Sequence, residues 1–171
     1  YLSDGGDVFA HAAALAAELT PPQDTHGAAV AAHHQVGGAR AEALAGFPTA
    51  RKAAALLQTH DPLTVLLWLM AHTEDTNLYY RGGAEGAAFV KAQAAAILAA
   101  PVERRISLAQ ALDDALISRW LSPGGCADLL AMALFLNNFF TAFTFSVNKN
   151  PNEMLIFVQP GNSCYEMTFF N

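Results

Sequence analysis

The spacing of apolar residues predicts helices over most of the chain. Apolar positions recur every three or four residues, as at Leu108, Leu112 and Leu116, which is the period of an amphipathic helix. Proline and glycine residues separate the helical segments. The expected helices are residues 7–19, 28–35, 39–45, 49–58, 62–72, 84–100, 107–120 and 124–136. Segment 73–81 is polar and is expected to be irregular, and the glycine pair that follows it is expected to break the chain.

A different pattern begins at residue 139. Phe139–Val147, Met154–Gln159 and Cys164–Phe170 alternate and are rich in aromatic and β-branched residues, which is typical of strands. We therefore predict an all-α, bundle-like domain at residues 1–138, followed by a β-rich tail at residues 139–171 that forms a short antiparallel meander of three strands. So abrupt a shift suggests a fusion, a frame change or an insertion, and a single domain that ends in a small sheet is the alternative.

The composition favours a folded protein and argues against a nucleic-acid-binding surface. Apolar residues make up 53% and charged residues 14% of the 171 residues, which is enough apolar surface for a buried core. Much of the apolar fraction is alanine, which favours helix and allows helices to pack closely. The net charge is −6, whereas binding to DNA or RNA requires clustered lysine and arginine.

The apolar segments do not predict a membrane span. Leu63–Ala71 is shorter than a bilayer is thick, and the segment after Leu129 is interrupted by two asparagines. Cys126 and Cys164 lack the spacing of a metal site or a disulfide framework. The sequence opens without Met and without a cleavable signal, so we expect a cytoplasmic protein that was cut from, or lacks part of, a larger parent chain.

Polar segments at helix boundaries carry the first candidate chemistry. Asp75 and Asn77 offer oxygen ligands of the kind that Mg²⁺ prefers, although both residue types also stabilise turns. Arg81 has a planar donor geometry that suits a phosphate, and Gly82-Gly83 allows the backbone to approach a ligand closely. The structural alternatives are an Arg81–Glu85 pair on one helix face and an ordinary glycine break.

Further candidates lie at the start of the last helix and near the N-terminus. Ser122, Gly124 and Gly125 open a helix whose free N–H groups suit an anion, although Ser122 also fits an ordinary N-cap. Asp128, in the second turn, is a candidate metal ligand or base, or else a solvated carboxylate near a helix N-terminus. His26 is a candidate acid, base or phosphate donor, or an isolated structural histidine.

Four segments, in this order, resemble the triphosphoribosyl-dephospho-CoA synthases. They read THG from Thr25, VGGARAEALAGFP from Val36, DTNLYYRGGAEGAAFV from Asp75 and DDALISRWLSPGGCADLLAMALFL from Asp113. The resemblance covers residues 25–136, and the N-terminal blocks of the family are not found in the chain.

The resemblance implies an all-helical transferase. Such an enzyme joins ATP and 3′-dephospho-CoA, releases adenine and makes the prosthetic-group precursor of an acyl-carrier subunit. Its partners would be these two substrates, and its cofactor would be Mg²⁺. Neither nucleic acid nor a membrane is expected to be bound, and a homo-oligomer is possible. The wording of segment 37–48 favours the malonate decarboxylase system over citrate lyase. A catalytically incomplete helical fragment or fusion that acts in assembly is the competing interpretation. Another Mg²⁺-dependent nucleotide-processing enzyme is a third.

The chemistry that the resemblance implies assigns a role to each candidate. Substitution at the anomeric carbon of the ATP ribose passes through an oxocarbenium-like state and needs a carboxylate, a donor for adenine and Mg²⁺ with basic groups. Asp75 and Asp128 are the expected metal or base carboxylates, with Asn77 in support. The expected phosphate, backbone and leaving-group contacts are Arg81, Arg40, Gly82, Gly83, Ser122, Gly124, Gly125 and His26.

Overall fold

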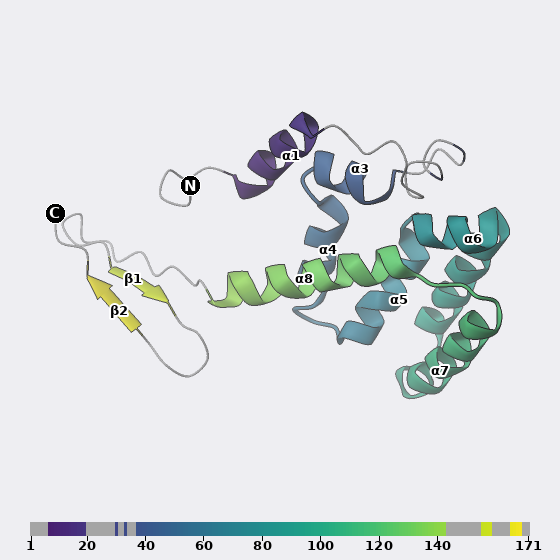
Figure 1. Cartoon of the computed structure of the whole chain (residues 1–171). Coiled ribbons are helices and arrows are strands. Elements are labelled where there is room, and N and C mark those ends of the chain that lie inside the picture. The colour runs from purple at the N-terminus through teal and green to yellow at the C-terminus, as the bar shows by residue number, and fades with distance from the viewer. Residues whose placement is uncertain are drawn as a thin grey trace.

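Helices make up most of the part of the chain that the computed structural model describes, which is residues 7–19, 30, 33, 37–142, 155–158 and 165–168. The elements are α1 (Val8–Glu18), α3 (Gly38–Leu44), α4 (Pro48–Leu56), α5 (Pro62–His72), α6 (Thr76–Ala99), α7 (Val102–Ser118), α8 (Gly124–Ala142), β1 (Leu155–Val158) and β2 (Tyr165–Thr168). α8 begins beside α6 and runs across α5 and α4 (Figure 1). The all-α class expected from the sequence is confirmed.

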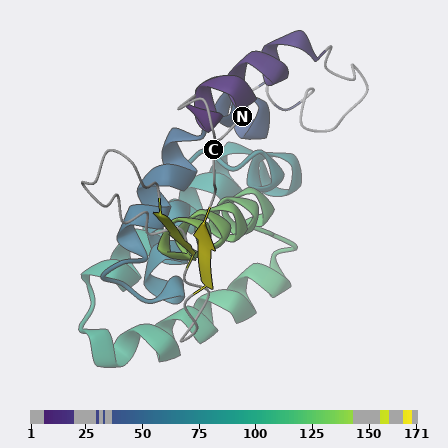
Figure 2. The same cartoon turned by 90° about the vertical axis from the view of Figure 1, so that its left-hand side faces the viewer.

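The core is formed by α4, α5, α6 and α8. The largest fully buried side chains are Leu67, Leu69, Val65, Val90 and Cys126. The buried face of α4 consists of alanines, and α8, which packs on α4, buries Ala133. Small side chains on both helices allow their backbones to approach closely, as the alanine content suggested. Turned by 90°, the molecule has α8 end-on at the centre of the helices, with α1 and α7 at opposite edges (Figure 2).

Two aspartates define the starts of α5 and α6. Asp61 precedes Pro62 and accepts hydrogen bonds from the N–H and the hydroxyl of Thr64 at 3.0 and 2.7 Å. Asp75 accepts from the N–H groups of Asn77 and Leu78. Each carboxylate thereby satisfies backbone donors that have no partner within the helix.

The expectation that segment 73–81 is irregular holds for residues 73–75 but is wrong from Thr76 onward. α6 begins at Thr76 because the carboxylate of Asp75 caps its first turn. The break expected at the glycine pair is a kink within this helix, where Gly83 has φ 61° and ψ −164°. The turn after α7 comes close to α6 at this point, since a Cβ on Gly82 would lie 2.3 Å from a methyl group of Leu121.

Two other expected boundaries also differ, and one expected helix lies mostly outside the described residues. α7 begins at Val102, five residues before the expected start at residue 107, because Pro101 adopts the conformation of an N-cap and Glu103 lies favourably in the first turn. The expected helix at 28–35 lies outside the described residues except for Val30 and His33, which are helical. α8 continues to Ala142, beyond the expected end at residue 136.

The predicted three-strand meander is not shown. Its first strand was expected to begin at Phe139, but residues 139–142 continue α8, since extending an existing helix is easier than starting a new element. Residues 143–154 lie outside the described residues. β1 pairs with β2 in antiparallel register, with Leu155 opposite Thr168 and Val158 opposite Tyr165. The boundary predicted between residues 138 and 139 stays a prediction.

Arginines connect α6 and α7. The guanidinium of Arg105 donates to the carbonyl oxygens of Leu98 and Ala100, at 2.9 and 3.3 Å, and so satisfies the C-terminal end of α6. At the other end of α7, the guanidinium of Arg119 lies 4.0 Å from the ring centroid of Phe89, a cation–π contact. These contacts hold the outer helix α7 against α6.

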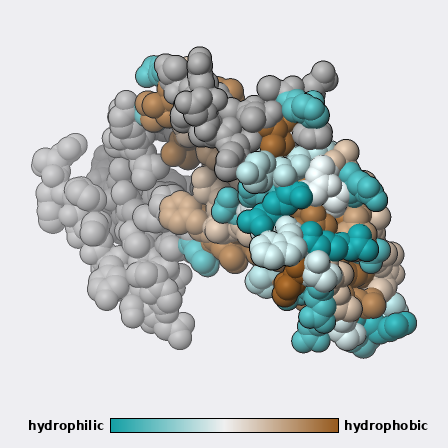
Figure 3. Space-filling view, turned by 45° about the vertical axis from the view of Figure 1, so that its right-hand side comes forward, coloured by the Kyte–Doolittle hydropathy of each residue, from teal (hydrophilic) through white to brown (hydrophobic). Residues whose placement is uncertain are grey.

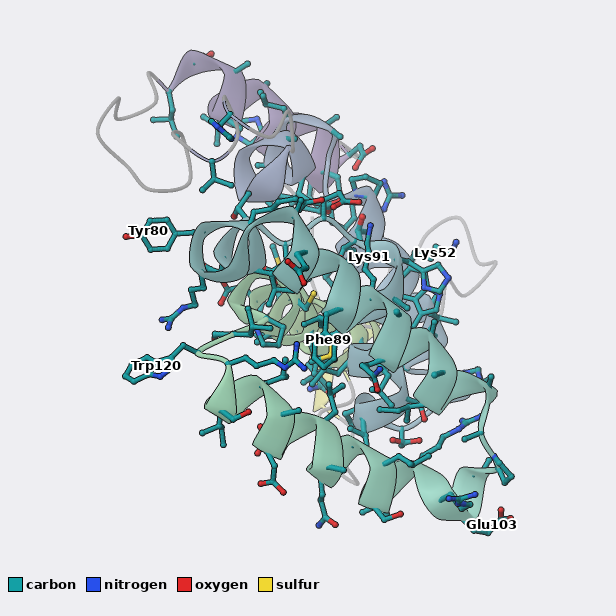
Figure 4. The ribbon with its side chains drawn as sticks, turned by 90° about the vertical axis from the view of Figure 1, so that its right-hand side faces the viewer. Lys52, Tyr80, Phe89, Lys91, Glu103 and Trp120 are labelled. Carbon is teal, nitrogen blue, oxygen red and sulfur yellow. The ribbon has the colours of Figure 1, made fainter. Side chains whose placement is uncertain are left out.

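The outer face that includes α6 and α7 has a mixed surface. Hydrophilic and hydrophobic side chains are interspersed on it (Figure 3). Tyr80 and Trp120 project from the same edge of the molecule (Figure 4), and Trp120 is 80% exposed. Among the helices of the described residues, none combines the length and the hydropathy that crossing a bilayer requires.

Candidate functional site

A pocket of about 420 Å³ lies where the first turns of several helices meet. α3 contributes Glu42, the start of α4 contributes Thr49, and the turn between α5 and α6 contributes residues 72–77. The first two turns of α8 contribute Gly125 and Asp128. Segments that are distant in the sequence therefore line one cavity.

Asp75 lies at the centre of this arrangement and is only 3% exposed. Its Oδ1 accepts from the N–H groups of Asn77 and Leu78, at 2.8 and 3.4 Å. Its Oδ2 accepts from the N–H of Cys126 in α8, at 2.8 Å. One buried carboxylate therefore satisfies the first turns of two helices, and its negative charge lies at the positive end of both helix dipoles.

Glycines allow the first turn of α8 to approach α6. A Cβ on Gly124 would lie 2.4 Å from the side-chain nitrogen of Asn77, and a Cβ on Gly125 would lie 3.1 Å from the carboxyl carbon of Asp75. A side chain at either position would need its neighbour to move. The glycine pair is therefore needed for close packing of helix against helix, in addition to any role in binding.

Cys126 is part of this junction but is not a nucleophile. Burial raises the pKa of its thiol to about 12, although a hydrogen bond shared with Thr73 partly opposes the increase. The Thr73 oxygen and the Cys126 sulfur are 3.3 Å apart. Because the thiolate is the reactive form of cysteine, burial disfavours reaction of this residue at neutral pH.

Glu74 lies at the pocket with both carboxylate oxygens paired. Lys91 forms an ion pair with Oε1, and the hydroxyl of Tyr79 donates to Oε2 at 2.6 Å. Burial of Glu74 raises its pKa, but the hydrogen bonds from Lys91 and Tyr79 outweigh burial and leave the pKa below its ordinary value. The same bond raises the pKa of Tyr79. Glu74 is therefore ionised at neutral pH.

The lining of the pocket is acidic. Glu42, Glu74, Asp75 and Asp128 contribute to it, and of the side chains that the structure describes no lysine or arginine does. Glu42 is already engaged with the N–H of Thr49, at 3.2 Å. A triphosphate would be repelled by such a lining unless cations neutralise it.

The carboxylates suit a cation that arrives together with its ligand. Within the described residues, no group of three or more His, Cys, Asp or Glu side chains is arranged to hold a metal ion. Mg²⁺ bound to nucleotide phosphates usually needs only one or two protein carboxylates. Asp128 is exposed at the pocket, so its donor chemistry fits that mode of binding.

Comparison with known proteins assigns the chain to a family. Residues 2–145 match the family CitG, described as ATP:dephospho-CoA triphosphoribosyl transferase. The chain belongs to this family. The match to the transferase family extends beyond residues 25–136, where the sequence motifs suggested the resemblance, and includes the whole of α1 and α8.

Curated relatives carry the corresponding name. A protein of Salmonella gallinarum called probable 2-(5''-triphosphoribosyl)-3'-dephosphocoenzyme-A synthase is 48% identical over 115 residues, which are 60% of this chain and 38% of the relative. The synthase of Pectobacterium atrosepticum is 43% identical over 122 residues, covering 62% of this chain and 38% of that protein. The chain thus spans well under half the length of these synthases. No solved structure matches it significantly.

The pocket brings together four of the site residues that the sequence predicted for a transferase of this family. They are Asp75, Asn77, Gly125 and Asp128. Gly124 lies directly behind them, against the side chain of Asn77. The catalytic and metal-binding roles expected for Asp75 and Asp128 stay predictions.

Four of the other predicted residues do not line the pocket. Arg81 is exposed on α6 and, like Gly82, Gly83 and Ser122, does not line the pocket. Only the backbone of Arg40 is described, within α3, and His26 lies outside the described residues.

Sequence reasoning did not assign Glu42 and Glu74 to the site. Both belong to polar segments that were recognised from the sequence, since Glu42 follows Arg40 in one block and Glu74 precedes Asp75 in another. The sequence shows that carboxylates are frequent around these turns. It does not show that the turns lie together in the fold.

Proposed function

We propose that the chain binds ATP and 3′-dephospho-CoA at this pocket and transfers the triphosphoribosyl group of ATP, with release of adenine. Family membership supports the reaction. The observation that supports the location is the meeting of residues from three separate sequence motifs, represented by Glu42, Asn77 and Asp128, in one cavity. A cavity of about 420 Å³ lies within the range of small-molecule sites.

The reaction replaces one bond to the anomeric carbon of the ATP ribose with another. The oxygen of a ribose hydroxyl of dephospho-CoA forms the new bond, and the glycosidic bond to adenine breaks, with its electron pair leaving on adenine. The hydroxyl proton passes to a carboxylate, and adenine takes up a proton. Asp128 is the candidate for the proton acceptor, because it is an exposed carboxylate at the pocket, whereas both oxygens of Asp75 already accept backbone N–H bonds.

Charge neutralisation is the main requirement that this site places on its ligands. The acidic lining repels phosphates, so we propose that Mg²⁺ enters with the triphosphate, held by Asp128. The ion would neutralise the phosphate charge. Asn77 would donate its amide to a ligand oxygen. Arg81 and Arg40 stay candidates for phosphate binding.

The biological role proposed is synthesis of the prosthetic-group precursor for an acyl-carrier subunit. Segment 37–48 favours malonate decarboxylase over citrate lyase as the system served. We propose a cytoplasmic location, which suits substrates of this kind. A homo-oligomer is compatible with this role.

The decisive experiment is chromatographic detection of adenine released from ATP in the presence of Mg²⁺, with and without 3′-dephospho-CoA. We expect release only when dephospho-CoA is present. Asp128→Asn should lower the rate by about 100-fold or more, the usual contribution of a general base. Asp114→Asn, on the exposed face of α7, is the matched control and should leave the rate unchanged.

The alternative function is that of a catalytically incomplete helical fragment or fusion that acts in assembly, an interpretation that the sequence leaves open. An absence of adenine release from the wild-type chain would overturn the proposed reaction for this chain and support that alternative. Equal loss in Asp128→Asn and Asp114→Asn would move the reaction away from the pocket.

A further inference from the structure

The carboxylate of Asp75 divides its two oxygens between two helices. Oδ1 serves α6 through the N–H groups of Asn77 and Leu78. Oδ2 serves α8 through the N–H of Cys126, which is 51 residues away in the sequence. A buried carboxylate is costly unless its charge is compensated by hydrogen bonds, and these three donors provide that compensation.

The surroundings of Asp75 reinforce this junction. The Thr73 hydroxyl and the Cys126 thiol share a hydrogen bond that runs from the α5–α6 turn to α8. The position of a Cβ on Gly125 lies 3.1 to 3.2 Å from three carboxyl atoms of Asp75. The first turn of α8 thus packs directly on the carboxylate, and any larger residue at that position would separate them.

The junction fixes the relative position of two pocket residues on different helices. Asn77 lies in the first turn of α6, and Asp128 lies in the second turn of α8. Neither of these residues is bonded to the other, so their separation depends on how the two helix starts are held together. Asp75 is the residue whose carboxylate bonds to the first turns of both helices.

We propose that Asp75 is a positioning residue, which joins the first turns of α6 and α8 and thereby sets the geometry of Asn77 and Asp128 in the pocket. This inference rests on the proposed function for its effect on substrate, but the junction itself can be tested without substrate. It differs from the metal-ligand role expected from the sequence, in which the carboxylate acts by direct contact with the ion.

Asp75→Asn distinguishes the bonds to α6 from the bond to α8. Asparagine caps helices about as well as aspartate, so its carbonyl oxygen still serves Asn77 and Leu78. Its NH₂ group then faces the N–H of Cys126, donor against donor. Asp61→Asn is the matched control, because Asp61 caps α5 and does not line the pocket.

The first measurement is amide hydrogen exchange in the metal-free and substrate-free protein. In Asp75→Asn, exchange at Cys126 should become roughly tenfold faster, the consequence of losing one charge-assisted bond, while Asn77 keeps its protection. Asp61→Asn should change neither amide. Unchanged exchange at Cys126 in Asp75→Asn would overturn the junction, because a pure metal ligand has no effect in metal-free protein.

The second measurement is the affinity of the folded variants for Mg²⁺ and ATP, by calorimetry. Asp75→Asn should weaken binding roughly tenfold, and Asp61→Asn should not, although it also removes a charged cap. Gly125→Ala retains the carboxylate but displaces α8, so a positioning role predicts weaker binding there too. Full affinity in Gly125→Ala, with loss only in Asp75→Asn, would overturn positioning and favour direct ligation.

Failure of the proposed function has a different signature. If the wild-type chain binds no ATP, the calorimetric arm rejects the pocket as the nucleotide site and, with it, the effect of Asp75 on substrate. The exchange arm still decides whether Asp75 joins the two helices. If Asp75→Asn does not fold, Gly125→Ala supplies both readouts with the carboxylate in place.

Discussion

Asp61 and Asp75 occupy the same position, immediately before the first turn of a helix, but their carboxylates work over different distances. Asp61 is exposed, and its carboxylate accepts hydrogen bonds from Thr64, three residues away. Asp75 is 3% exposed and reaches Cys126, 51 residues away. Asp61 caps the start of one helix, whereas Asp75 caps a helix and also fixes a tertiary contact between two helices.

The difference shows how burial changes the effect of an N-cap. When an exposed cap is removed, the N–H groups that it accepted from can bond to water instead, so the loss costs little beyond the local helix start. A buried cap leaves donors that water does not reach, and each of these costs more. The surroundings that make Asp75 hard to replace also make it suitable for setting the geometry of a pocket.

Replacing each of the two aspartates by alanine, in separate variants, gives the largest contrast in stability. Asp75→Ala removes the acceptor of three backbone N–H groups, and we expect a loss of about 3 kcal/mol in the free energy of unfolding. Urea unfolding followed by circular dichroism measures it. A loss below about 1 kcal/mol would mean that water replaces the carboxylate and that the buried cap is equivalent to the exposed one.

The reactivity of Cys126 is a more local way to test the comparison. With its pKa raised to about 12 by burial, only about one thiol in ten thousand is ionised at pH 8. The charge of Asp75 adds to the increase. Asp75→Asn should therefore accelerate modification of Cys126 by a disulfide reagent by roughly tenfold, both by loosening α8 and by removing a negative charge.

The control for this reaction is Asp61→Asn, measured in proteins in which Cys164 is replaced by serine so that Cys126 alone reports. Its rate should equal that of the chain with Asp61 and Asp75 intact. Equal acceleration in both variants would indicate that the thiol responds to overall stability rather than to the junction at α8.

Local sequence signals predicted the helix starts better than they predicted what those starts do. Asp61 with Pro62 was recognised as the start of a helix, and α5 begins there. Asp75 was assigned to an irregular segment, because Thr76 and Asn77 lack the proline that made the first start obvious. Gly83 was expected to break the chain, and its positive φ instead permits a kink inside α6.

The candidate site was predictable in part. Asp75, Asn77, Gly125 and Asp128 were selected from the sequence and line one pocket. The bond from Asp75 to Cys126 was not predictable, because no periodicity relates residues that lie 51 positions apart. Glu74 was missed for the same reason, since only the fold brings Lys91 within reach of its carboxylate.

Asp61→Ala should have the smaller effect of the two alanine replacements. Loss of an exposed aspartate cap typically costs about 1 kcal/mol, and the same urea unfolding experiment measures it. Thr64 is the second check, because its hydroxyl is the donor to Asp61 at 2.7 Å. Thr64→Val should lower stability in the wild type but have less effect when Asp61 is already alanine. Additive losses would contradict a direct bond.

The smallest expected effect is the pH dependence of the exposed cap. Hydrogen bonds from Thr64, first from its hydroxyl and then from its N–H, lower the pKa of Asp61 from its ordinary value of 3.8. The unfolded chain therefore takes up a proton before the folded protein does as the pH falls. The stabilisation is complete above the ordinary pKa and is lost as the pH drops through the lowered, folded-state pKa.

Comparing wild type with Asp61→Asn isolates this contribution, because Glu74, whose pKa is also lowered, is present in both proteins and cancels. The difference between their unfolding free energies should be constant above about pH 6 and shrink towards about pH 3. A difference that stays constant over this range would mean that protonation of Asp61 does not change stability, so that its pKa is the same in the folded and the unfolded states. The exposed cap would then depend on hydrogen bonding alone, and charge would matter only where the carboxylate is buried, at Asp75.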